Sequence, residues 1–324
     1  MKFHALALFC LLASGAASAA PIDPADYAKP HRLVDIGGRK LNLFCAGQGA
    51  PTVVFEAPLG SAGWTWFKVH GKVAEQTRAC VYDRAGLGFS DPSGRAGDLL
   101  NIVDDLRALE KAGGLSGPYL LVANSYGAMA AQFYAYRFPS EVAGLVLVDG
   151  QSEDENQLLD GVTGGMFSKM TAPTVERDEA CAKQAESGQV GDQCSGETPL
   201  YKEPKLAEVL KKEQSSPVYW RARGAEFLGY SDASSRELRG ARKSFGPTPL
   251  LILTRTVSPF LVPGQPQSDM NKAAEAAHRK SLDDIVALAP KGEIREIPQA
   301  AHYIQLDQPE AVSDTVIEMV KKLR

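Results

Sequence analysis

A serine at the end of an apolar run is the residue of this chain best placed to do chemistry. Residues 121–128 read Leu-Val-Ala-Asn-Ser-Tyr-Gly-Ala, and a helix-forming, alanine-rich segment follows to residue 138. A strand that turns sharply into a helix between small residues lifts the hydroxyl of Ser125 clear of the sheet. The helix N-terminus and the backbone N–H of Tyr126 then point at any oxyanion formed there. We therefore predict that Ser125 is a nucleophile, with Ala123 in place of the more usual first glycine.

A nucleophilic serine needs a base, and few histidines are available. His302 lies just after the predicted strand 294–297 and before the terminal helix, where a loop can present an imidazole to the carboxyl edge of a sheet. We interpret His31, His70 and His278 as surface or hydrogen-bonded structural residues, because they precede the first strand or fall in helical patterns. His302 is therefore the predicted base.

The imidazole in turn needs a carboxylate that fixes its tautomer. Asp149 directly follows the apolar run 143–148, whereas the run 250–253 has no carboxylate after it until Asp269. Asp149 is the predicted acid. A structural role at the strand end is the alternative for Asp149, because aspartate is a common turn former; the other candidate acids are Glu153, Asp154 and Asp269.

Acyl transfer also needs a second oxyanion donor. Residues 56–60 read Glu-Ala-Pro-Leu-Gly after a predicted strand, and Pro58 has no N–H, so the backbone of Leu59 is the expected donor. Trp64 and Trp66 follow and are predicted to wall the substrate pocket, with packing in the aromatic core as the alternative.

Alternating strand and helix patterns predict the scaffold that positions these groups. Short β-rich runs separated by amphipathic helices indicate an α/β fold with crossovers and a mostly parallel sheet. The predicted strands cover residues 31–36, 40–45, 52–55, 79–82, 119–123, 143–148, 250–253 and 294–297. Residues 151–246 break this rhythm and are predicted to be an insertion between the sixth and seventh strands. Its aromatic side chains are expected to fold over the pocket: Tyr219, Trp220, Phe227 and Tyr230.

Composition excludes several classes of partner. The 324 residues are 44% hydrophobic, and 35 basic against 39 acidic side chains give a net charge of −4 without a basic cluster. No footprint for nucleic acid or anionic lipid is present. The charge balance suits a neutral substrate. The composition does not indicate an oligomeric state.

The first 20 residues have the pattern of a secretory signal peptide. A lysine precedes a short apolar run, and small residues lead to an Ala-Ser-Ala cleavage site. We expect a secreted or periplasmic protein without a stable membrane anchor; an uncleaved N-terminal anchor is the alternative. Four cysteines then remain in a compartment that permits disulfides, and three pairings are open. No cysteine or histidine spacing suits a metal site.

Together these residues resemble the α/β-hydrolase superfamily. The similarity lies in residues 123–127, in residues 82–91 (Tyr-Asp-Arg-Ala-Gly-Leu-Gly-Phe-Ser-Asp) and in Ala301-His302, and the order Ser125, Asp149, His302 is the family's order. Many members carry their acid before a proline after the seventh strand, where this chain has Ser258. Some branches take it from the end of the sixth strand, which favours Asp149.

The resemblance implies an eight-stranded, mostly parallel sheet with helices on both faces. Residues 21–150 and 247–324 would form the catalytic domain, and residues 151–246 a helical cap between strands 6 and 7. The family's strand order places Cys45 near Cys80, which leaves Cys181 to pair with Cys194 inside the cap.

The predicted function is that of a secreted serine esterase that cleaves a small carboxylic ester or lactone without a metal or organic cofactor. A serine rather than an aspartate at the elbow argues against the haloalkane dehalogenase and epoxide hydrolase branches. Two alternatives remain. Asn124-Ser125 resembles the elbow of C–C bond hydrolases that cleave ring-fission dienones, and a non-catalytic binding relative is the alternative from another class.

Overall fold

One eight-stranded sheet organises the protein. The computed structural model describes residues 22–195, 198–261 and 264–324, so the predicted signal peptide lies outside the described residues. The sheet order is β1-β2-β4-β3-β5-β6-β7-β8. The strands span Arg32–Asp35 (β1), Lys40–Ala46 (β2), Val53–Glu56 (β3), Ala79–Tyr82 (β4), Tyr119–Asn124 (β5), Val142–Val148 (β6), Leu250–Arg255 (β7) and Gly292–Ile297 (β8). Each lies within two residues of a predicted strand, so the predicted fold class is confirmed.

The strand directions bring the candidate groups to one edge. β2 is antiparallel to both β1 and β4, and the strands from β4 to β8 in the sheet order are parallel. In the register of β5 and β6, Asn124 lies opposite Val148. Ser125 directly follows β5 and Asp149 directly follows β6, so both residues lie at the same carboxyl edge of the sheet.

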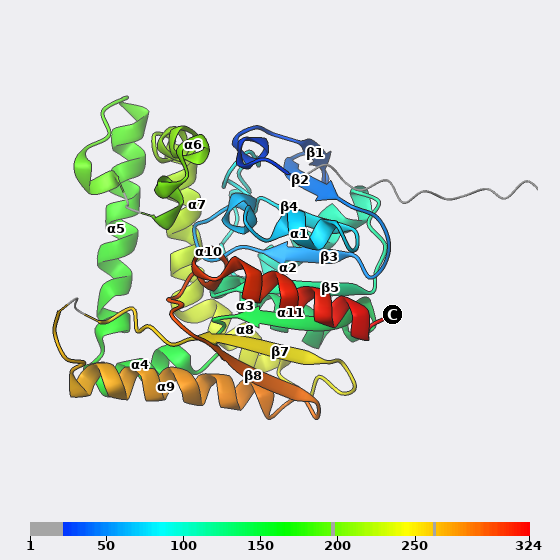
Figure 1. Ribbon diagram of the computed structural model, residues 1–324. Helices are drawn as coiled ribbons and strands as arrows, with labels where there is room; N and C mark the ends of the chain where they lie inside the picture. The colour runs from blue at the N-terminus through cyan, green and yellow to red at the C-terminus, as the bar shows by residue number, and fades with distance from the viewer. Residues whose placement is uncertain (1–21, 196–197, 262–263) are drawn as a thin grey trace, which may run out of the picture.

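Helices cover both faces of this sheet (Figure 1). One core packs beneath α1 (His70–Ala74) and α11 (Pro309–Lys322), and the other beneath α2 (Leu99–Ala112), α3 (Tyr126–Arg137) and α9 (Asp269–Val286). In β6, Val146 and Val148 belong to the first core, whereas Leu145 and Leu147 belong to the second. A central parallel strand buried on both faces needs this continuous apolar run.

The chain between β6 and β7 builds five α-helices in its described part: α4 (Glu155–Thr163), α5 (Met166–Glu186), α6 (Pro204–Gln214), α7 (Pro217–Leu228) and α8 (Ser234–Ala241). In Figure 1, α5, α6 and α7 stand beside one end of the sheet. The last helix differs from the expectation of a cap, because Leu238 of α8 is fully buried in the core shared with α2 and α3. α8 therefore packs in the layer beneath the sheet.

Short helical turns complete the described chain. They are η1 (Pro24–Ala28), η2 (Gly63–Trp66), η3 (Pro139–Glu141), η4 (Asp192–Cys194), η5 (Pro199–Lys202), the π-helical η6 (Gly229–Ala233) and α10 (Ile304–Asp307). Among the described residues, none of the helices has the length and apolar character needed to cross a membrane.

Two disulfides link segments of the fold. Cys45 and Cys80 lie opposite each other on β2 and β4 and are bonded. Cys181 on α5 is bonded to Cys194 in η4, which closes a loop at the outer side of the insertion. Both pairings are those that the family resemblance implied.

Candidate active site

Ser125 sits on a strained turn between β5 and α3. Its φ of 56° and ψ of −123° lie outside the regions that side-chain-bearing residues prefer. The turn also needs small neighbours, because a Cβ atom on Gly127 would lie 2.6 Å from the carbonyl oxygen of Ala57. Ala123 is fully buried. The small-x-Ser-x-Gly pattern therefore reflects the close approach of α3 to the loop after β3.

His302 and Asp149 are directly hydrogen-bonded. His302 Nδ1 lies 2.6 Å from Asp149 Oδ2. An ionised carboxylate only accepts, so the proton must reside on Nδ1, and Nε2 is left as the basic nitrogen. In the described part of the chain, no hydrogen bond joins His302 to Ser125, but both side chains line one cavity. This contact is often long in unliganded hydrolases and tightens with substrate.

Asn124 connects the nucleophile turn to the histidine loop. Its side-chain Nδ2 donates to the carbonyl oxygens of Val148, at 2.7 Å, and of His302, at 3.2 Å. Its Oδ1 accepts from Gln305 Nε2 at 3.0 Å, and the residue is fully buried. Asn124 therefore holds β5, β6 and the loop of His302 in one arrangement.

Asp149 has two further partners that the sequence interpretation missed. Arg255 at the end of β7 donates from Nη1 to Asp149 Oδ2 at 2.5 Å, and His278 Nε2 on α9 lies 3.2 Å from Oδ1. Burial alone would raise the pKa of Asp149. The hydrogen bonds from His278 and His302 and the charge of Arg255 outweigh it, so this pKa lies well below its usual range.

His278 is a buried structural histidine, as interpreted, but it belongs to the site. Its Nδ1 lies 3.1 Å from Glu155 Oε1, and only 4% of the residue is exposed. Burial lowers the pKa of His278, whereas the charges and hydrogen bonds of Glu155 and Asp149 raise it, with a net rise to about 9. Arg255 was detectable from the sequence, because it ends the strand beside β6. His278 gave no comparable signal.

The alternative acids lie elsewhere. Glu153 is bound by Arg242, and Asp154 is bound by Arg239. Asp269 is fully exposed and pairs with the neighbouring Lys272. Among the described carboxylates, Asp149 is the one hydrogen-bonded to His302.

The two expected oxyanion donors face the same cavity. Leu59 and Tyr126 both line it, and within the described chain neither backbone N–H has a protein acceptor. The side chain of Tyr126 points away, because its hydroxyl contacts Gly97 O at 2.6 Å and Ser234 Oγ at 2.7 Å. Only its backbone is available to an oxyanion.

The loop that carries Leu59 is held by a buried arginine. Arg84 Nη1 donates to Ala57 O at 2.6 Å and Nη2 donates to Pro58 O at 2.7 Å. On the other side of Leu59, the N–H of Gly60 donates to Glu226 Oε2 at 2.7 Å. The carbonyl and N–H groups that flank Leu59 are thereby fixed.

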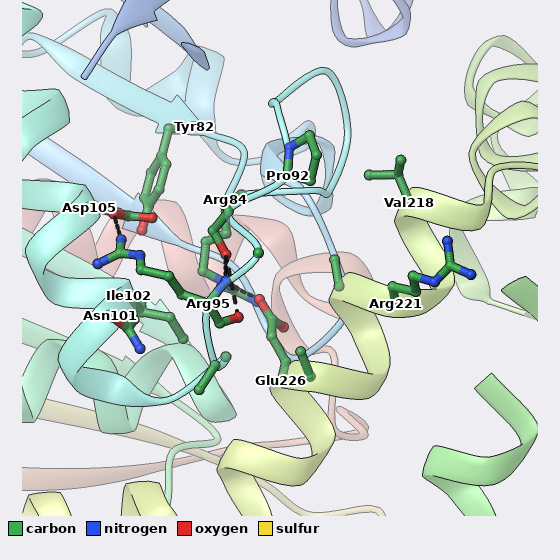
Figure 2. Close-up of a pocket in the computed structure, with 17 residues that line it drawn as sticks. Tyr82, Arg84, Pro92, Arg95, Asn101, Ile102, Asp105, Val218, Arg221 and Glu226 are labelled. Carbon is green, nitrogen blue, oxygen red and sulfur yellow. Dashed lines mark hydrogen bonds and ion pairs between the residues drawn. The ribbon is translucent and has the colours of Figure 1, made fainter. Parts of the chain in front are cut away.

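Arg84 is also the centre of an ion-pair cluster. It binds Glu226 of α7 at 2.6 Å and Glu56 of β3 at 2.7 Å, and all three side chains are at most 5% exposed. Figure 2 shows Arg84 and Glu226 pointing toward each other beside a second cavity of about 400 Å³, which lies between α2, α7 and the loop after β4. The helix α7 of the insertion is therefore connected to the loop that carries Leu59. No local sequence pattern indicates this connection, because Arg84 and Glu226 are 142 positions apart.

The cavity that holds Ser125 and His302 has a volume of about 360 Å³. Four predicted pocket residues line it: Trp64, Tyr219, Phe227 and Tyr230. The predictions for Trp66 and Trp220 are wrong. Trp66 is fully buried against Phe55, with ring centroids 5.0 Å apart. Trp220 is 3% exposed and donates from Nε1 to the carbonyl oxygen of Gln214.

Polar residues of the insertion make this cavity less apolar than the aromatic pattern suggested. Its lining includes Thr198, Glu213, Gln214 and Arg223, together with Ser61 and Tyr303. Arg223 is bound through both carboxylate oxygens of Asp178, which is fully buried. Among the described residues, no group of three or more potential ligands is arranged to hold a metal ion.

Comparisons with known proteins identify a family and several relatives of this chain. A family model described as the alpha/beta hydrolase family matches residues 43–315. The chain is 28% identical over 119 residues to the uncharacterized protein YbdG of Bacillus subtilis (strain 168). These residues make up 36% of this chain and 37% of that protein. The chain thus spans well under half the length of the first relatives it matches, 37% and 41%.

Solved structures share the fold at low sequence identity. A thermophilic esterase from Thermogutta terrifontis gives a TM-score of 0.59 at 19% identity, over 91% of this chain and 99% of that one. Est816, described as an N-acyl homoserine lactone degrading enzyme, gives 0.58 at 18% identity, over 88% and 98%.

Proposed function

Since the chain belongs to the alpha/beta hydrolase family, we propose that it is a serine hydrolase that cleaves a carboxylic ester or a lactone through an acyl-enzyme on Ser125. The observation that carries the proposal is the 2.6 Å contact between His302 Nδ1 and Asp149 Oδ2, next to a strained Ser125 in the same cavity. The esterase and the lactone-degrading enzyme among its structural neighbours support this substrate class.

The reaction follows from the protonation states of the site. His302 Nε2 takes the proton of Ser125 as Oγ attacks the carbonyl carbon, and Asp149 stabilises the imidazolium that forms. The backbone N–H groups of Leu59 and Tyr126 donate to the oxyanion. His302 then protonates the leaving alkoxide, and a water activated by the same imidazole hydrolyses the acyl-enzyme.

Covalent labelling tests the proposal. A fluorophosphonate probe should label the purified protein on Ser125 and abolish its hydrolysis of p-nitrophenyl esters. Ser125→Ala should remove both the label and the activity. Ser61→Ala is the matched control, because Ser61 lines the same cavity and its hydroxyl contacts Thr65 Oγ1. A wild-type protein that neither labels nor hydrolyses any ester or lactone would refute the proposal and favour a binding role.

The C–C bond hydrolase alternative rested on Asn124. The hydrogen bonds of this side chain to Val148, His302 and Gln305 account for it without substrate contact. Turnover of a ring-fission dienone in preference to every ester and lactone in a parallel assay would restore that alternative.

Two expectations about the whole protein belong to this proposal. We propose that it is exported, because residues 1–20 have the signal-peptide pattern and the two disulfides suit an oxidising compartment. We also propose that residues 21–150 and 247–324 form the catalytic domain and that the inserted residues 151–246, apart from α8, supply its cap. Within that insertion, residues of α6 and α7 line the cavity over Ser125, together with Thr198, Leu200 and Tyr230.

A further inference from the structure

A carboxyl group without an ion-pair partner faces the catalytic cavity. Glu213, near the end of α6, lines the cavity that contains Ser125 and His302. Its Oε1 accepts from the backbone N–H of Gly88 at 2.8 Å. In the described part of the chain, no side-chain donor binds its other oxygen, and the residue is half-buried at the cavity wall. An acceptor placed this way is available to a ligand.

The charges around Glu213 are negative. Burial and the nearby carboxylates of Asp83 and Glu226 raise the pKa of Glu213 to about 8, against one stabilising hydrogen bond from Gly88. The neighbouring cations have carboxylate partners of their own: Arg84 is bound by Glu226 and Glu56, and Nη1 of Arg223, which lines the same cavity, is bound by Asp178. An ammonium group beside Glu213 would supply the missing counterion and lower this pKa, so binding of a cation favours the ionised carboxylate.

Aromatic residues line the same cavity as the carboxyl group. Trp64, Tyr219 and Tyr303 line the same cavity. Burial raises the pKa of the Tyr219 phenol, and the charge of the Glu213 carboxylate raises it further. Aromatic faces combined with a carboxylate are the recognised environment for an ammonium group, because the ring quadrupole attracts cations.

We propose that Glu213, with the rings of Trp64 and Tyr219, forms a subsite that binds a cationic ammonium group of the substrate while Ser125 attacks its ester or lactone carbonyl. This inference rests on the proposed function and specifies its substrate class. It revises the expectation of a neutral substrate, which came from net charge alone. Net charge does not report one buried carboxyl group inside a cavity.

Isosteric substrates test the subsite directly. Choline butyrate and 3,3-dimethylbutyl butyrate differ in the charge of the alcohol group. The p-nitrophenyl esters of 4-(trimethylammonio)butyric acid and of 5,5-dimethylhexanoic acid differ in the same way on the acyl side. We expect the purified protein to prefer the charged member of at least one pair by about 10-fold or more in kcat/KM. Because both members of a pair share the chemical step, the ratio isolates recognition of the charge.

Two variants assign the preference to one residue. Glu213→Gln keeps an oxygen for the Gly88 N–H but removes the charge, so the ratio should fall toward 1 while fluorophosphonate labelling continues. Glu208→Gln is the matched control, because Glu208 is exposed on the same helix. It should leave the ratio unchanged.

The outcomes are distinct. A wild-type ratio near 1 for both pairs, in a protein that labels normally, overturns the ammonium subsite and leaves the proposed hydrolase intact. The same holds if Glu213→Gln retains the wild-type ratio. Failure of the wild type to label or to hydrolyse any ester overturns the proposed function itself. If Glu213→Gln does not fold, the wild-type ratio and inhibition by tetramethylammonium chloride decide: competitive inhibition of choline butyrate hydrolysis at concentrations where sodium chloride has no effect supports the subsite, and no inhibition overturns it.

Discussion

Asp149 is hydrogen-bonded to His302 and is a counterion of two buried cations, Arg255 and His278. Replacing it with asparagine keeps the shape, but an amide can donate to Nδ1 and select the wrong tautomer of His302. We expect Asp149→Asn to lower kcat by roughly three to four orders of magnitude. It should also lower the free energy of unfolding, because Arg255 and His278 each lose one of their two carboxylate partners. Ester kinetics and urea unfolding measure the two effects.

The control for this substitution is Asp269→Asn, which changes a fully exposed carboxylate on α9. It should leave kcat and unfolding unchanged. Activity of Asp149→Asn within tenfold of wild type would move the acid of the triad to another residue.

His278 gives the site a pH dependence of stability. Its pKa in the folded protein, raised to about 9 by Glu155 and Asp149, exceeds its ordinary value of 6.5. The folded state therefore binds this proton more tightly, and the stabilisation is fully present below pH 6.5 and is lost as the pH rises through 9. The facing groups are Glu155 on α4, Asp149 after β6 and Arg255 on β7.

We expect His278→Gln to remove part of the loss of stability between pH 7 and pH 10. Other groups titrate in this range, among them Glu110, whose pKa burial raises to about 8. Only the difference between wild type and variant therefore isolates His278. Urea unfolding at the two pH values measures it, and parallel pH profiles for the two proteins would contradict the assignment.

The loop that carries the proposed oxyanion donor Leu59 is held by a helix of the insertion, through Glu226 of α7. Arg84 binds two loop carbonyls and Glu226 of α7 at once, and a lysine cannot make these contacts together because it lacks the planar fork. We expect Arg84→Lys to lower kcat by roughly 10- to 100-fold with little change in KM, since the donor of Leu59 would be misplaced. Kinetics and labelling rates below the unfolding temperature measure this.

Arg95→Lys is the matched comparison. Arg95 borders the second cavity in Figure 2 and pairs with Asp105, without contact to the loop that carries Leu59. If the two variants label at equal rates, Arg84 does not position the oxyanion donor.

The elements themselves were largely predictable, whereas their polar connections were not. Periodicity and turn residues located the strands because burial of a parallel sheet demands apolar runs such as residues 143–148. Ser125 and His302 stood at element ends, where local patterns are informative. Glu213, Glu226 and His278 are ionisable residues inside helices, a position usually exposed to solvent. Their burial depends on contacts with distant segments, which no local pattern reports.

The same distinction explains the two tryptophans that were wrongly assigned. Trp66 lies two positions after Trp64, and Trp220 lies one position after Tyr219. On a helix, a shift of one or two positions changes the direction of the side chain, so one ring of each pair lines the cavity and the other packs in the core. Residue type suggested a pocket wall, and the orientation of the helix decided which rings reach it.

At the scale of the whole molecule, the two disulfides stabilise different parts. Cys45–Cys80 joins two strands of the sheet across 35 positions, and Cys181–Cys194 closes a shorter loop of 13 positions in the insertion. The chain-entropy description gives about 4 kcal/mol for the longer loop and about 3 kcal/mol for the shorter one. Replacing either pair with serines should therefore lower the melting temperature.

The two replacements should differ in their effect on catalysis. Thr198 and Leu200, which follow the Cys194 loop, line the catalytic cavity, whereas Cys45 and Cys80 lie within the sheet. We expect the variant without Cys181–Cys194 to show a higher KM as well as a lower melting temperature. Without this disulfide, the segment of Thr198 and Leu200 is no longer linked covalently to α5. The variant without Cys45–Cys80 should melt earlier with KM unchanged. Thermal melts and ester kinetics of both double variants measure this, and an equal change in KM would mean that the insertion and the sheet domain respond as one cooperative unit.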